Sequence, residues 1–162
     1  MVMAAVLSSY IYMARSLARL ANQQTLETEA RRTLATFTQD VQAATGISGT
    51  PSASTVTLAI ASAAGSTTVA YTYDSAAGTL TRTPAGGTAL ILLRNITSSG
   101  LTIYYYDGAG NAYASYTNYL TGIKQLMLQF STQAGVAGNG SQTRIYQIAS
   151  SRLVLRNRAY LQ

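Results

Sequence analysis

The first 45 residues decide the fold; they read MVMAAVLSSYIYMA (1–14) and RSLARLANQQTLETEARRTLATFTQDVQAAT (15–45). None of the 13 glycines and neither of the two prolines occurs before Gly46, although these residues most often interrupt a helix. We therefore predict one continuous helix over residues 1–45. At 1.5 Å per residue it would be about 65 Å long, more than its own small domain can cover, so part of it must be buried elsewhere.

The two halves of this helix differ in character. Residues 1–14 are apolar on every side and carry no charge, whereas charges and amides appear from Arg15 onward. A helix that is apolar all round needs non-aqueous surroundings on every face. The apolar run is shorter than the roughly 20 residues of a bilayer span, so by itself it is typical of a buried helix or of a signal-peptide core. A signal peptide would end at a cleavage site, but here the helical pattern continues.

A one-sided apolar stripe begins further along the same helix. Ala30, Leu34, Phe37, Val41 and Ala44 recur at steps of four and three residues, the spacing of an amphipathic helix. We expect this stripe to pack on the domain that follows.

Charged residues of the helix fall into two groups. Arg15 and Arg19 stand one turn apart at the end of the apolar run, where they could reach lipid headgroups; in a packed assembly they would instead need carboxylate partners. Two acid-first pairs further along are expected to form an exposed, solvated face. These pairs are Glu27 with Arg31 and Glu29 with Arg32.

After Gly46 the sequence changes to short runs rich in Thr, Val, Ile, Leu and Tyr, which Gly, Ser, Asn and Asp separate. Such runs predict strands joined by turns, and the short loops at 73–78 and 106–111 imply antiparallel neighbours. The sequence thus predicts an α+β protein, with the helix of residues 1–45 packed on an antiparallel β-rich head of residues 46–162. The expected strands are 55–61, 67–73, 79–83, 89–94, 101–106, 112–116, 123–131 and 144–156.

Alternation within the strands predicts which side chains lie in the core. Val69, Tyr71 and Tyr73 alternate with Thr and Ala, and the same period of two recurs in QLMLQF (125–130). We expect both faces to meet the apolar stripe of the helix.

The residue inventory excludes most catalytic and metal chemistry. The chain has no Cys and no His, which removes disulfides, thiol nucleophiles, His-ligated metals and Ser-His or Cys-His pairs. Nothing in the spacing of the five acids brings two together as a glycosidase requires. Asp74 and Asp107 are expected to form turns, because neither loop has the repeated ligands of a Ca²⁺ site. We therefore expect no enzyme, no cofactor and no metal ion.

The net charge of +6 is concentrated in the second part of the chain, where residues 46–162 hold seven basic and two acidic side chains. Arg152, Arg156 and Arg158 fall on alternate positions of the last expected strand and could form a stripe that binds DNA phosphates or another anion. The alternative, which we favour, is an exposed strand whose arginines keep it soluble.

These features together resemble the type IV pilin-like family, including the pseudopilins of type II secretion. MVMAAVLSSYIYMARS (1–16) resembles the helix that follows the family's processing site, and ARRTLATFTQDVQAA (30–44) resembles the helix-to-head segment of the larger, minor-pilin-type members. TYDSAAGTLTRTP (72–84) and SRLVLRNRA (151–159) are similar to the sheet hairpin and final strand of those members. The sequence opens at Met1 without the family's leader or its acidic first mature residues, so we expect the mature helix to begin upstream.

The resemblance implies a structural subunit of an extracellular filament on the bacterial cell surface. Residues 1–20 would lie first in the inner membrane and then pack, in the filament core, against copies of the same chain and other pilin-like subunits; residues 21–45 would pack on the head. Head-to-tail contacts that do not close into a ring generate such a filament. The residues expected to carry assembly are Met1, Val2, Met3, Val6, Leu7, Ile11, Tyr12, Met13 and Leu17.

A second reading belongs to another class of protein. The helix could serve only as a stalk for a membrane-anchored or secreted β-rich module that binds glycan, protein or DNA. Self-association separates the two hypotheses, because only the first predicts regular fibres. Neither reading distinguishes adhesion, motility, secretion and DNA uptake, or a major from a minor subunit.

Overall fold

The computed structural model describes residues 2–62, 65–113, 122–134 and 144–155. Within these ranges one long helix, α1 (Val2–Ala43), is followed only by strands. The strands are β1 (Ala44–Ser48), β2 (Thr55–Ser62), β3 (Gly65–Asp74), β4 (Thr79–Pro84), β5 (Leu90–Leu93), β6 (Ile96–Tyr106), β7 (Gln125–Ala134), β8 (Arg144–Ala149) and β9 (Leu153–Val154).

The continuous N-terminal helix is confirmed, but it ends two residues earlier than predicted, at Ala43. The next residues form β1, a strand that the sequence did not predict. This strand pairs antiparallel with β2, and Ala44 lies opposite Ile60. Pairing with β2 gives the backbone N–H and C=O groups of this segment hydrogen-bond partners, which the last carbonyl groups of a longer helix would lack. The chain then turns at Gly49, whose φ of 70° suits glycine.

The strands form two antiparallel sheets. The first sheet has the order β1-β2-β3-β4-β5, so each strand pairs with its neighbour in the chain. In the second sheet β7 lies between β6 and β8, and β9 also pairs with β7. The α+β class and the antiparallel head are therefore confirmed.

The prediction of one continuous strand over residues 144–156 is wrong. It is interrupted at residues 150–152, and β8 and β9 pair with two different parts of β7. Ser150 causes the break: its backbone N–H donates to the Leu128 carbonyl at 2.8 Å, and its hydroxyl accepts the Leu128 N–H at 2.9 Å. In the expected strand 112–116, Ala112 forms only an isolated bridge with Tyr106, and residues 114–116 lie outside the described ranges.

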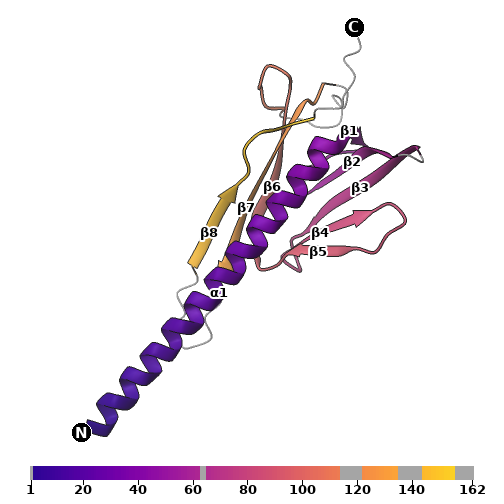
Figure 1. Cartoon of the computed structure of the whole chain (residues 1–162). Coiled ribbons are helices and arrows are strands. Elements are labelled where there is room, and N and C mark those ends of the chain that lie inside the picture. The colour runs from indigo at the N-terminus through magenta and orange to yellow at the C-terminus, as the bar shows by residue number, and fades with distance from the viewer. Residues whose placement is uncertain (1, 63–64, 114–121, 135–143, 156–162) are drawn as a thin grey trace.

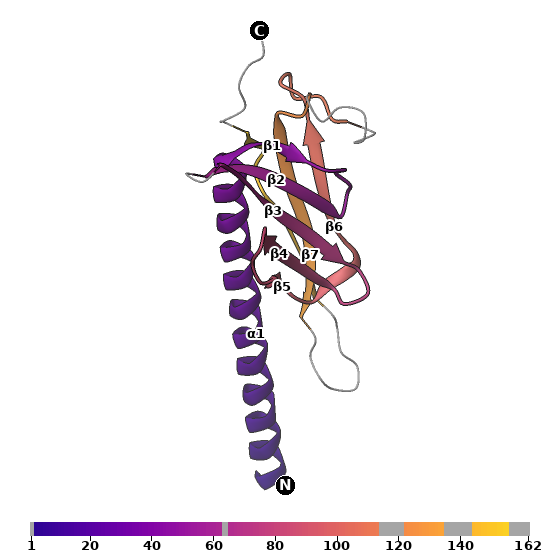
Figure 2. The ribbon, with the colours of Figure 1, turned by 90° about the vertical axis from the view of Figure 1, so that its right-hand side faces the viewer.

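The second half of α1 lies across both sheets, and its first half extends beyond the head (Figures 1 and 2). Phe37 is fully buried and meets Tyr71 of β3 edge-to-face, with ring centroids 5.1 Å apart. Val69, Tyr71 and Tyr73 are buried as predicted, and so are the alternate positions of β7. Those positions are Leu126, Leu128 and Phe130.

Both predicted Asp turns are confirmed. The carboxylate of Asp74 accepts the backbone N–H groups of Ala76 and Ala77 at 2.8 and 3.0 Å. In the other turn, Asn111 donates its backbone and side-chain N–H groups to the Asp107 carboxylate, and these bonds hold the pKa of that carboxyl below its usual range. Gly78 closes the first turn with a φ of 61°, where a Cβ would lie 2.8 Å from the carbonyl oxygen of Ile96.

Candidate assembly surface

The first half of α1 leaves its apolar side chains uncovered. Nine large hydrophobic residues on it are between 41% and 88% exposed. At 3.6 residues per turn, Val6, Ile11 and Tyr12 point in three directions, roughly a third of a turn apart. The exposed residues therefore surround the helix instead of forming one stripe. They are Met3, Val6, Leu7, Tyr10, Ile11, Tyr12, Met13, Leu17 and Leu20.

Seven of the nine residues predicted to carry assembly belong to this exposed set. The other two are not described: Met1 lies outside the described residues, and the side chain of Val2 is not described either. Within the described residues, the strands of the same molecule do not enclose this apolar segment. An uncovered apolar surface of this kind in water typically marks a contact with a partner or with lipid.

The second half of α1 forms the predicted seam with the head. Ala30, Phe37 and Val41 are buried, and Leu34 is half-buried against the same core. The hydroxyl of Thr33 donates to the Leu92 carbonyl of β5 at 3.0 Å, which fastens the helix to the first sheet. The seam also includes Leu26, Thr33 and Asp40, which the sequence analysis did not single out, and Ala44 of the predicted stripe is buried directly after the helix.

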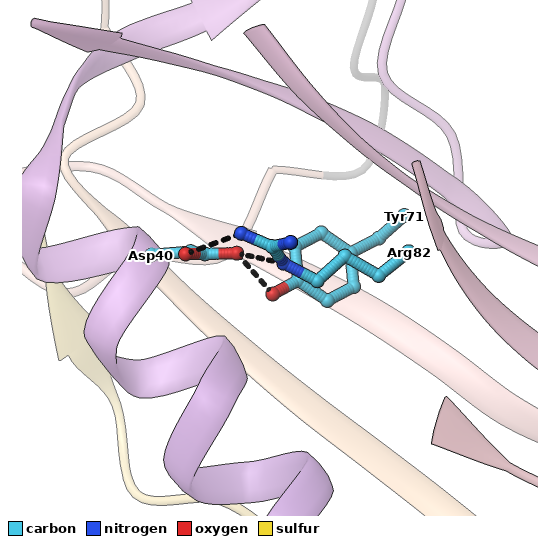
Figure 3. Close-up of polar contacts among 3 residues, drawn as sticks. All are labelled: Asp40, Tyr71 and Arg82. Carbon is cyan, nitrogen blue, oxygen red and sulfur yellow. Dashed lines mark hydrogen bonds and ion pairs between the residues drawn. The ribbon is translucent and has the colours of Figure 1, made fainter. Parts of the chain in front are cut away.

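A polar cluster at the end of this seam joins the helix to β3 and β4 (Figure 3). Asp40 accepts hydrogen bonds from Arg82 at both carboxylate oxygens, from Nε at 2.6 Å and from Nη2 at 3.1 Å. The Tyr71 hydroxyl donates to the same carboxylate at 2.6 Å. A bidentate, charge-assisted contact of this kind fixes geometry as well as adding energy.

The environment of the cluster shifts two of its titrating groups. Burial raises the pKa of the Tyr71 phenol far above its usual range, and the hydrogen bond to Asp40 acts in the same direction. The pKa of the Arg82 guanidinium is also raised, chiefly by its hydrogen bond to Asp40. Tyr71 therefore stays neutral while the guanidinium beside it stays charged.

The spacing of residues contained a signal for this cluster. Asp40 follows Phe37 by three residues and precedes Val41, so it falls on the apolar stripe, where a carboxylate needs a partner. On β4, Arg82 is two residues from the buried Leu80 and so faces the same side. A carboxylate on the core-facing stripe of the helix and a guanidinium on the core-facing side of a strand each need an opposite charge. The sequence patterns therefore predict that Asp40 and Arg82 pair.

The raised pKa of Tyr71 predicts a loss of stability at alkaline pH. Above a pH of about 10 the unfolded chain loses the phenolic proton whereas the folded chain keeps it. Each further pH unit should then lower the free energy of unfolding by about 1.4 kcal/mol through this residue. Urea unfolding measured between about pH 9 and pH 12 tests this. Above about pH 10, the decrease in the free energy of unfolding per pH unit should be smaller in Tyr71→Phe than in the unsubstituted chain, by about 1.4 kcal/mol. An equal slope in the two proteins would contradict the assignment.

The less favoured alternative, an arginine stripe on the last strand, is not supported by the residue that is described. Arg152 lies just before β9, outside the strands, and its guanidinium stands 4.2 Å from the centre of the Tyr106 ring. It also donates to the Gly110 carbonyl at 3.2 Å. Arg152 thus holds the 107–111 turn, while Arg156 and Arg158 lie outside the described residues.

Within the described residues, no three His, Cys, Asp or Glu side chains gather as a metal site would need. Among the same residues, no helix combines the length and the hydropathy that crossing a membrane requires. Comparisons with protein-family models, with curated proteins and with solved structures found no match.

Proposed function

We propose that this chain is a structural subunit of a type IV pilus-like extracellular filament. The observation that carries the proposal is the first half of α1, whose large apolar side chains stay exposed on all sides beyond the head. Such a helical segment is stable only where every one of its faces is shielded from water. A bilayer supplies that environment before assembly, and neighbouring copies of the same helix supply it afterwards.

The division of α1 supports a filament over a closed oligomer. The second half packs on its own head through the seam of Phe37, Val41 and Asp40, whereas the large apolar side chains described on the first half are exposed. Each copy therefore offers a protruding helix at one end and a head at the other. Contacts between two such unlike surfaces are head-to-tail, and they continue indefinitely unless the rotation closes a ring.

Electron microscopy of the full chain tests the proposal. The protein is extracted from membranes in detergent, the detergent is removed, and both the sample and the cell surface are imaged. We expect long fibres of uniform width with a regular repeat. Discrete monomers or small oligomers under all conditions would contradict the proposal and would favour an anchored binding module.

A further inference from the structure

Six of the nine exposed apolar residues on the first half of α1 follow a seven-residue repeat, although the nine together surround the helix. The six recur at alternating steps of three and four residues, so they occupy positions a and d of a heptad written a to g. All six are at least 54% exposed. We call them the heptad stripe: Met3, Val6, Tyr10, Met13, Leu17 and Leu20.

The heptad stripe faces away from the head. At 3.6 residues per turn, its mean direction lies about 160° around the helix axis from that of the buried residues of α1, which run from Leu26 to Val41. Figure 2 shows the head on one side of α1 only. A second helix can therefore lie along the stripe without meeting the head of the first.

The heptad positions beside the stripe suit close contact between two helices. Between residues 2 and 23, positions e and g hold no charged residue, and most of them hold Ala or Ser. Arg15 and Arg19 fall on positions f and c, away from the stripe. Small residues at a helix interface let the two backbones approach closely. Two copies of this positively charged chain therefore meet no like charge along this face.

A regular heptad selects a helix, and specifically a second copy of this one, as the occupant of the stripe. Lipid tails cover apolar side chains without imposing a spacing along the helix, whereas a partner helix meets only positions a and d. Because the stripe and its flanks are uncharged, no charged partner is favoured over a copy. The same stripe on a second chain matches it in length and in spacing.

We propose that two copies of the chain pair in the membrane, before filament assembly, as a parallel coiled coil with the heptad stripe at its centre. This inference rests on the proposed function, because subunits in one membrane carry their heads on the same side and lie at the same depth. Their helices are then parallel, and identical residues face each other. The pairing extends over about 25 Å, from Met3 to Leu20. It ends there because Gln24 and Glu27 take the next a and d positions.

The pair leaves part of the apolar surface for later contacts. Ile11 and Tyr12 fall on positions b and c, outside the stripe, and both are exposed in the single chain. A two-stranded coiled coil does not cover these positions. They stay available to further copies, so the pair is a building block for the open-ended filament contacts and does not end assembly.

Single cysteines test the pairing, because the chain has no native cysteine. Val6→Cys, Met13→Cys and Leu17→Cys should each give a disulfide-linked dimer when membranes that hold the full chain are mildly oxidised. The matched controls, Ser8→Cys and Arg15→Cys, lie on the opposite side of the helix and should give less than about a fifth as much dimer. Equal dimer at all five positions, dimer chiefly at the controls, or no dimer at any position would overturn the pairing.

A charge on the stripe gives a second test. Leu17→Glu should raise the dissociation constant of the dimer in detergent at least about tenfold, because it places two like charges at the centre of the coil. Arg15→Glu introduces the same side chain two residues away, outside the stripe, and should change that constant less than about threefold. Analytical ultracentrifugation measures the constant, and circular dichroism checks the fold. Equal effects of the two substitutions would contradict the proposed geometry.

Electron microscopy of the same preparations separates this inference from the proposed function. A chain whose cysteines form dimers at the stripe positions alone, but which never forms fibres, would overturn the filament and leave the pair. Regular fibres from a chain whose cysteines show no preference for the stripe would overturn the pair and leave the filament.

Discussion

Val6→Glu should abolish filament formation and leave the head folded. Val6 is 63% exposed in the single chain and lies about 30 Å along α1 from Leu26, the first buried residue of the seam, so the substitution leaves the seam with the head intact. In the assembly the same position would be enclosed by other copies of the helix. An unpaired carboxylate buried there costs several kcal/mol, which is a large loss for a contact repeated in every subunit. Leu7→Glu should behave in the same way.

The measurement combines electron microscopy with thermal unfolding followed by circular dichroism. The matched control is Val154→Glu, since Val154 is 51% exposed on β9 between two buried leucines and thus faces away from the core. Fibres should be absent from the Val6 variant and present in the Val154 variant, with similar melting temperatures. Normal filaments from Val6→Glu would rule out burial of this segment in a filament core.

Much of the fold could be predicted because the signals are local. The lack of Gly and Pro before Gly46 predicted α1 to within two residues of its end. The period of two predicted the buried faces of β3 and β7, including Tyr71 and Phe130. These properties depend on spacing along the chain, so no knowledge of the tertiary structure was needed.

The errors arose where backbone pairing with distant residues decides the outcome. Strand β1 exists because residues 44–48 pair with β2, and its two β-branched residues, Thr45 and Ile47, are too few to predict a strand directly after a helix. Likewise the break between β8 and β9 depends on Ser150 bonding to the backbone of Leu128, 22 residues away. A local sequence pattern cannot predict a contact whose second residue is brought close only by the topology of the fold.

The candidate assembly surface was predictable to the extent that it is a property of one segment. A helix that is apolar on all sides must be shielded from water by a partner or by lipid, which the sequence alone indicates. Seven of the nine residues named from the sequence are exposed in the structure. The small hollow that Glu29 of α1 lines together with Leu90 and Ile91 of β5 was not predictable. It requires α1 and β5 to meet, and β5 lies about sixty residues further along the chain. Glu29 was expected to pair with Arg32, but no such ion pair forms within the described residues.

Removal of Asp40 should produce the largest loss of stability among single substitutions of the described polar residues that join α1 to the head. Its side chain is only 11% exposed and holds the partly buried Arg82 together with the Tyr71 hydroxyl. Asp40→Ala leaves that cation and that hydroxyl without a partner in the core. Breaking a buried ion pair from one side typically costs about 3–5 kcal/mol, so we expect a loss of this size in urea unfolding at neutral pH.

Three further variants separate the ion pair from its surroundings. Glu27→Ala breaks an exposed pair on the same helix and should cost less than about 0.5 kcal/mol. Tyr71→Phe removes one hydrogen bond to the carboxylate and should cost about 1.5–3 kcal/mol. Asp40→Leu combined with Arg82→Met removes both charges and should be more stable than Asp40→Ala, because no unpaired charge stays in the seam. If Asp40→Ala were as mild as Glu27→Ala, the cluster would not be what fastens the helix to the head.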